Sequence, residues 1–244
     1  MRIKSPGRSS LAVTMLVIFL TACASSTPPL KGRQVPQSPD SSSFGQLGKA
    51  DIDRMADVQL RENTESLRLL MTKLYKRNPH ELQKSTSGTA EQMVDWVFDG
   101  GQGWKFPGIN GLQGTDAIQL AFKPDYTGDR VLPLIVGLQT MLIKAHGDKT
   151  DFYYLDTLDP QKIYNASRNV EITAWKLSNA RDEHGQLYLL TNEINDKERN
   201  LSFEREFGKI IGRLDLFAIT LAEKSQRMIS RVVQNLATAM FLPF

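Results

Sequence analysis

Cysteine is almost absent from this chain of 244 residues, since Cys23 is the only one. A disulfide needs two cysteines and a thiolate metal site usually needs several, so the chain can form neither within itself. Small domains of oxidising compartments usually depend on disulfides, and a domain without them needs a core large enough to hold its fold. About 195 residues follow a polar N-terminal segment, which suffices for one ordinary core.

The chain also lacks the spacings of familiar catalytic and ligand-binding motifs. Its histidines, His80, His146 and His184, form no HExxH pair, and each is expected at a helix end or turn, where a solvated or capping histidine is usual. Neither G-x-S-x-G nor S-x-x-K occurs, and the glycines between residues 100 and 108 do not have phosphate-loop spacing. The aspartates between residues 148 and 159 lack the EF-hand pattern. We therefore predict no metal, no other cofactor and no enzymatic activity.

The segment with a specific meaning is the start of the chain. Arg2, Lys4 and Arg8 precede an apolar run, Leu11 to Leu20, which is too short to span a membrane as a mature helix. A basic start, a short apolar run and small residues before a cleavage point are typical of a secretory signal. The run ends in Leu20-Thr21-Ala22-Cys23, which resembles the lipobox of bacterial lipoproteins.

The lipobox resemblance covers only the first 25 residues or so, and it implies a lipid anchor. It implies that a signal peptide, residues 1–22, is cut off between Ala22 and Cys23, that the Cys23 sulfur takes a diacylglyceryl group and that the new amine is acylated. Several acyl chains anchor more firmly than one, because each buried methylene contributes about 0.8 kcal/mol. Ala24 and Ser25 stand where Asp favours retention in the inner membrane, so the resemblance implies an outer-membrane protein that faces the periplasm. The alternative is an ordinary signal peptide with a chance cysteine.

The charge of the mature chain is balanced. The whole sequence has 30 basic and 27 acidic residues. Three of the basic residues lie in the predicted signal peptide, whose removal leaves 27 basic against 27 acidic residues. No basic excess would attract nucleic acid or lipid headgroups, so we predict no nucleic-acid partner.

A tether is predicted between the lipid and the domain. Residues 23–48 are rich in Ser, Pro and Gly and contain too few large apolar residues to offset the entropy of ordering. As a coil this segment would reach roughly 25–30 Å. Residues 49–244 are predicted to form the helical periplasmic domain.

The pattern of apolar residues predicts a single, mostly α-helical domain of six or seven helices with at most a minor strand element. Helices are expected at about 50–76, from Pro79, from the capping box of Thr89 and Gln92, at about 115–122, and from Asp159-Pro160 to about residue 181. Residues 186–194 are the best strand candidate, with an extended loop or a helix end as alternatives.

Two further helices are expected at the centre of the domain. The most apolar run of the mature chain, Val131 to Ile143, predicts a buried helix that starts near Pro133. Apolar spacing from about Leu201 to Ala239 predicts a long final helix, in which Leu214 and Leu221 face the helix of the 130s. Within it Gly208 and Gly212 are spaced to let another helix approach closely.

Trp104 and Phe106 lie in a Gly/Pro-rich loop and are the only weak candidates for a binding site. An aromatic residue in such a loop can anchor a partner protein. The alternative is that both pack into the domain as a plug of the loop.

The leading functional hypothesis is a non-enzymatic, lipid-anchored helical module that binds a protein partner in the envelope as a scaffold or accessory factor. The alternative is a module that binds a small apolar or lipid ligand in a cavity between helices. A cell-envelope hydrolase with an unrecognised site is a third hypothesis.

Overall fold

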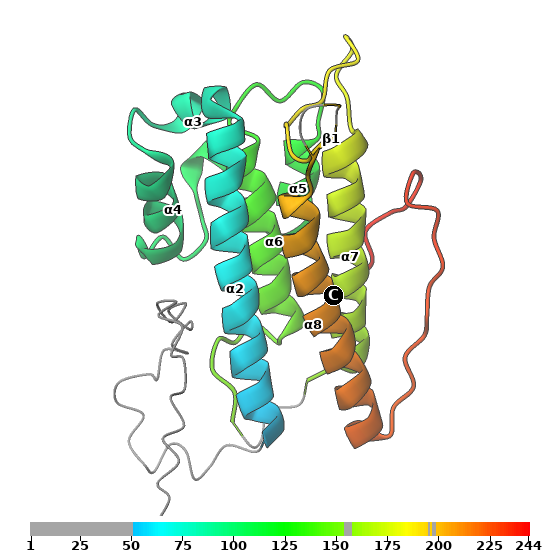
Figure 1. Cartoon of the computed structure of the whole chain (residues 1–244). Helices are drawn as coiled ribbons and strands as arrows, with labels where there is room; N and C mark the ends of the chain where they lie inside the picture. Colours follow the sequence, from blue (N-terminus) through cyan, green and yellow to red (C-terminus); the bar gives the residue numbers. More distant parts are fainter. Residues whose placement is uncertain (1–50, 154–157, 195, 197–198) are drawn as a thin grey trace, which may run out of the picture. The chain divides into compact units, whose positions relative to one another are not determined.

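The computed structural model describes residues 51–153, 158–194, 196 and 199–244, all of which belong to one compact unit, residues 42–244. The described residues form seven α-helices and one short two-stranded sheet, which confirms the prediction of a mostly α-helical domain (Figure 1). None of the described helices combines the length and the apolar character needed to cross a membrane. The predicted signal peptide, Cys23 and the tether lie outside the described residues.

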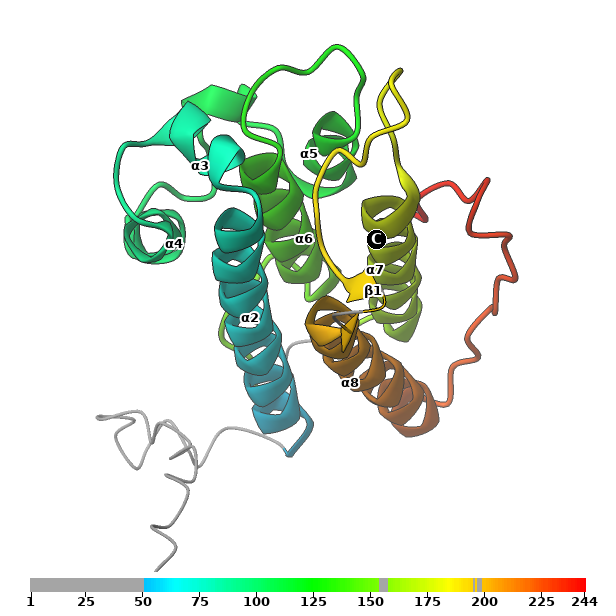
Figure 2. The ribbon, with the colours of Figure 1, turned by 45° about the horizontal axis from the view of Figure 1, so that its top comes forward.

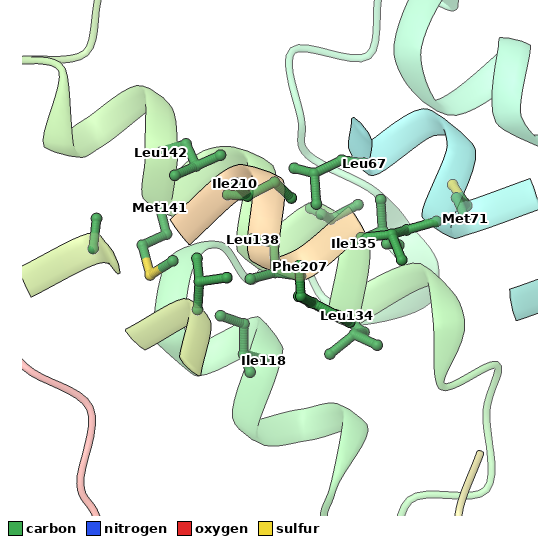
Figure 3. Close-up of a cluster of buried hydrophobic side chains, with 14 of the residues drawn as sticks. Leu67, Met71, Ile118, Leu134, Ile135, Leu138, Met141, Leu142, Phe207 and Ile210 are labelled. Carbon is green, nitrogen blue, oxygen red and sulfur yellow. The ribbon is translucent and has the colours of Figure 1, made fainter. Parts of the chain in front are cut away.

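The central helix is α6 (Val131–Ala145), and thirteen of its fifteen residues are buried. Helices α5 (Gly114–Ala121), α2 (Asp51–Arg77) and α7 (Pro160–Asn179) pack around it. The side chains of α6 meet those of α2, α5 and α8 in the core shown in Figure 3. The prediction of a buried central helix over this run is therefore confirmed.

Gly137 allows α5 to lie directly on α6. A Cβ at this position would come within 2.7 Å of the Gly114 carbonyl oxygen and of the Ile118 nitrogen. At the same crossing the Gly114 N–H donates a 2.7 Å hydrogen bond to the Thr140 hydroxyl oxygen. Polar and small residues inside the apolar run thus fix the close contact between α5 and α6.

Short helices follow α2 and begin where the sequence predicts. Helix α3 (Pro79–Ser85) has Pro79 in its first turn, and α4 (Ala90–Asp99) begins with the capping box of Thr89 and Gln92. A 3₁₀ turn, η1 (Pro107–Ile109), precedes α5. Helix α7 has Asp159 at its N-cap, where the side chain accepts a hydrogen bond from the Gln161 N–H.

The strand prediction for residues 186–194 holds only at its end. Glu193–Ile194 forms β1, which pairs antiparallel with β2 (Arg199–Asn200), and Leu187 makes an isolated bridge to Arg181. The segment between them, residues 188–192, is a loop without regular secondary structure.

The final helix is shorter than predicted and has different neighbours. Helix α8 runs from Ser202 to Ser225, and Gln226 takes a left-handed conformation, with a φ of 54°. Leu214 and Leu221 are buried as expected, but α8 packs mainly against α7 and α2, and less extensively against α6. An ion pair joins α7 to α8, where Arg168 donates to both oxygens of Asp215 at 2.7 Å.

The predicted helical continuation to Ala239 is wrong, because residues 227–244 leave the helix and return to α7 (Figure 1). Met228 and Val233 on this segment are almost fully exposed, whereas Phe241 and Phe244 pack against the core. The apolar spacing of residues 228–239 therefore does not reflect one helix face. The chain buries the end of this segment against α7 instead.

Candidate protein-binding surface

The predicted binding residues Trp104 and Phe106 lie against the domain. Phe106 is fully buried and its ring centroid is 5.1 Å from that of Trp96. Trp104 is half-buried and its ring centroid lies 5.4 Å from that of Phe98. This packing is that of a loop plug. The other predicted site residues, Ala22 and Cys23, lie outside the described residues.

The outward side of α8 is the apolar surface that sequence reasoning missed. We call Arg205, Gly208, Gly212, Leu216, Ile219 and Glu223 the α8 outer face, because all six are exposed and follow each other at intervals of three or four residues. Leu216 is 59% exposed and Ile219 is 45% exposed. The helical spacing of Leu216 and Ile219 from the two glycines is visible in the sequence. The stronger apolar pattern of the buried side of the same helix made this second face hard to recognise.

The two glycines of the α8 outer face have no neighbour that explains them. A Cβ built on Gly208 or Gly212 meets no heavy atom of the described residues within 4 Å outside its own helix. Glycine inside a helix costs about 1 kcal/mol relative to alanine. The predicted close approach of another helix is therefore not met within the described part of the chain. In Figures 1 and 2 α8 lies between α2 and α7 at one side of the bundle.

A cleft of about 460 Å³ continues the α8 outer face at the C-terminal end of the helix. Its walls combine apolar and charged side chains. They are Ile219, Ala222, Glu223, Gln226, Arg227, Met228, Ile229 and Arg231. Met228 at the edge of the cleft is 94% exposed, so no other described residue covers this apolar side chain.

Three amide side chains of α7 hold the segment that forms one wall of the cleft. Gln161, Asn165 and Asn169 are spaced by four residues, and each bonds the backbone of the C-terminal segment. The Gln161 oxygen accepts from the Ser230 N–H at 2.7 Å. Asn169 both accepts from the Leu242 N–H at 2.7 Å and donates to its carbonyl oxygen at 2.8 Å. These bonds position the segment without a helix or a sheet.

The buried carboxylate of Asp129 is a structural group. It accepts hydrogen bonds from the hydroxyls of Tyr75 and Ser85 at 2.6 and 2.7 Å, and from the backbone N–H of Val131 at 2.9 Å. Burial raises the pKa of Asp129 and, together with the nearby carboxylate, the pKa of Tyr75. A perturbed pKa can mark a catalytic group, but here the carboxylate oxygens are occupied by protein donors at the start of α6.

His146 is the C-cap residue of α6, which agrees with the prediction of a capping histidine, but it is fully buried and not solvated. Its ring stacks on Phe217 with centroids 5.9 Å apart, and Nδ1 lies 2.7 Å from the Leu142 carbonyl oxygen. Burial lowers the pKa of His146 to about 4, so the ring is neutral at pH 7, and its Nδ1–H donates a hydrogen bond to the Leu142 carbonyl oxygen.

The neutral ring of His146 determines how Gln59 is oriented. The Nε2 atom has no proton and lies 2.6 Å from the Gln59 amide oxygen, while the Gln59 amide nitrogen is buried without a partner among the described residues. Turning the amide by 180° lets its nitrogen donate to Nε2, which pairs both groups. This arrangement links α2 to α6 in the interior and leaves the ring inaccessible to a substrate or a metal.

No group of three or more His, Cys, Asp or Glu side chains is placed to hold a metal ion within the part of the chain that the structure describes. No family model, no curated protein and no solved structure matches this chain.

Proposed function

We propose that this chain is a non-enzymatic lipoprotein module that is held at the outer membrane by lipid on Cys23, faces the periplasm and binds a protein partner of the envelope. The proposed binding surface is the α8 outer face together with the adjoining cleft. The observation that carries the proposal is the exposure of Leu216 and Ile219 beside two glycines with no neighbour of their own.

The exposed apolar residues and the glycines of this surface are better explained by contact with a partner helix than by exposure to solvent. Burial of the exposed leucine and isoleucine against a partner stabilises the complex by about 25 cal/mol per Å² of apolar area removed from water. Glycines let a helix backbone approach closely, which increases the contact area of the neighbouring apolar side chains. The lipobox supports a location in the envelope, because its resemblance implies an anchor on Cys23.

A photoreactive amino acid in place of Ile219, tested in intact cells, would examine this proposal. We expect a discrete protein adduct on irradiation, because the side chain is exposed on the surface that the partner covers. The matched control carries the same amino acid at Gln119, which is exposed on α5 far along the sequence. Cys23→Ser in the same background should diminish the adduct if lipid attachment brings the two proteins together.

Three results would contradict the proposal. An absence of protein adducts at position 219 would show that no protein partner contacts this position. Equal adducts at 119 and 219 would show that the contact is not specific to the α8 outer face. An adduct with a lipid or another small apolar molecule alone would favour the ligand-binding hypothesis. Hydrolysis of an envelope substrate by the purified chain would favour the hydrolase hypothesis.

A further inference from the structure

The α8 outer face is nearly self-complementary when the helix is reversed. Its members are separated by three, four, four, three and four residues from Arg205 to Glu223, and the reversed order gives almost the same intervals. An antiparallel helix centred on Leu214 therefore places Leu216 opposite Gly212, and Ile219 level with residue 209, one residue from Gly208. Leu216 of each copy then meets a position without a side chain, and this occurs twice about a twofold axis.

We propose that the partner of the α8 outer face is α8 of a second copy of this chain, paired antiparallel. The inference rests on the proposed function, because it names the partner of the same surface. The occupant follows from the matching of large side chains with glycines and from the charges at the two ends of the face.

The charges at the ends of the α8 outer face favour the antiparallel arrangement. Arg205 and Glu223 are exposed, and neither has an ion-pair partner in the described ranges of the chain. They are about 27 Å apart along the helix axis. Antiparallel pairing brings Arg205 of each copy next to Glu223 of the other, whereas parallel pairing brings like charges together.

The cleft at the end of α8 also receives a residue in this arrangement. Leu201, just before α8, is 49% exposed. Reversal about Leu214 brings Leu201 of the second copy to the C-terminal end of α8, where the cleft lies. The exposed leucine and the uncovered cleft, which lie at opposite ends of one copy, thus meet between two copies.

The contact area between the two α8 helices is small, so the lipid anchor matters for pairing. One helix pair over about 27 Å buries less than the roughly 1,200 Å² of a small stable interface. Free molecules would therefore associate weakly. Copies confined to one membrane meet at a much higher effective concentration, which raises the dimer fraction without any new contact.

Cysteine pairing in the full-length chain tests the arrangement. One tagged copy carries Gly212→Cys and a differently tagged copy carries Leu216→Cys, and mild oxidation is applied in intact cells. We expect a mixed covalent dimer, because these positions face each other. Gly212→Cys alone should not link to itself, because two copies of residue 212 are offset by about 6 Å along the axis and lie beyond the reach of a disulfide. Lys123→Cys, exposed in a loop, is the collision control, and the unmodified chain controls for Cys23.

Charge exchange gives a second readout in the purified lipidated chain in detergent, by sedimentation. Arg205→Glu and Glu223→Arg should each raise the dimer dissociation constant roughly fivefold, and the double variant should restore it. Gly212→Leu should raise the constant more than about tenfold, because it fills the position that Leu216 needs. Its Cβ meets no atom within a single copy, so the fold should be kept, and Gln119→Leu is the matched control.

Two outcomes would overturn the inference. A mixed dimer no more abundant than the Lys123→Cys control excludes self-pairing, and linkage of Gly212→Cys to itself excludes the antiparallel arrangement. If self-pairing fails while position 219 still forms an adduct with a different protein, the proposed function stands and only the second copy is wrong. If neither forms, both fail.

Discussion

Replacement of His146 should change how the stability of the domain depends on pH. The buried ring has a pKa of about 4, against about 6.5 for an exposed histidine. Between these values the unfolded chain binds a proton that the folded chain does not, so stability is lost as the pH falls through this window. From pH 7 to pH 5 this one group should remove about 2 kcal/mol of unfolding free energy.

Urea melts of wild type and His146→Gln at pH 7 and pH 5 measure this effect. Gln cannot titrate, so the loss between the two pH values should be smaller in the variant by about 2 kcal/mol, whatever its stability at pH 7. Asp129 and Glu171 have pKa values raised by burial, and this works in the opposite direction in both proteins. Their contribution cancels in the comparison.

Two matched variants control the histidine experiment. His80→Gln and His184→Gln make the same substitution at exposed histidines and control for the exchange itself. The reasoning is refuted if His146→Gln loses as much stability between pH 7 and pH 5 as the wild type does. Titration of the His146 ring by NMR with a pKa near 6.5 would refute it independently.

Three further predictions concern the anchor, the core and the C-terminal segment. Cys23→Ser should abolish palmitate labelling and release the protein from the membrane fraction, and unchanged labelling would exclude the lipid anchor. Leu214→Ala and Leu221→Ala should each cost about 2–5 kcal/mol in denaturant melts, because both side chains are buried, whereas exposed Lys224→Ala should change stability by at most about 0.5 kcal/mol. Asn169→Leu removes both bonds to the Leu242 backbone and should cost about 1–3 kcal/mol, and an unchanged melt would show that the segment is not held there.

Local chemistry allowed most helices to be predicted. Thr89 with Gln92 and Asp159 with Pro160 are start signals that involve only neighbouring residues, and both begin helices in the structure. The buried α6 follows from its composition alone, since a run so apolar must avoid water. These features need no knowledge of the rest of the chain.

The errors arose where distant residues decide the structure. The apolar spacing after Ser225 resembles a helix, but Asn165 and Asn169 of α7 bind the backbone of the returning segment. An amide on a polar helix face gives no signal that it holds a distant backbone. His146 likewise has a helix-end position in the sequence, and only the tertiary packing shows that Phe217 covers it.

Only the glycines of the candidate surface could be predicted from the sequence. Gly208 and Gly212 indicated a close approach by another helix, and the structure provides no such neighbour within the described residues. Leu216 and Ile219 lie off the buried stripe, and their exposure depends on where α2 and α7 lie. The predicted signal peptide, tether and lipid site stay predictions.

The most direct test of the central claim is whether a protein covers the α8 outer face in the envelope. Leu216→Cys can be labelled with a small maleimide in intact cells and in the purified chain at high dilution. We expect strong labelling in the dilute protein and protection in cells, while Gln119→Cys reacts equally in both. Equal labelling of position 216 in cells and in dilute solution would show an uncovered surface and contradict the account.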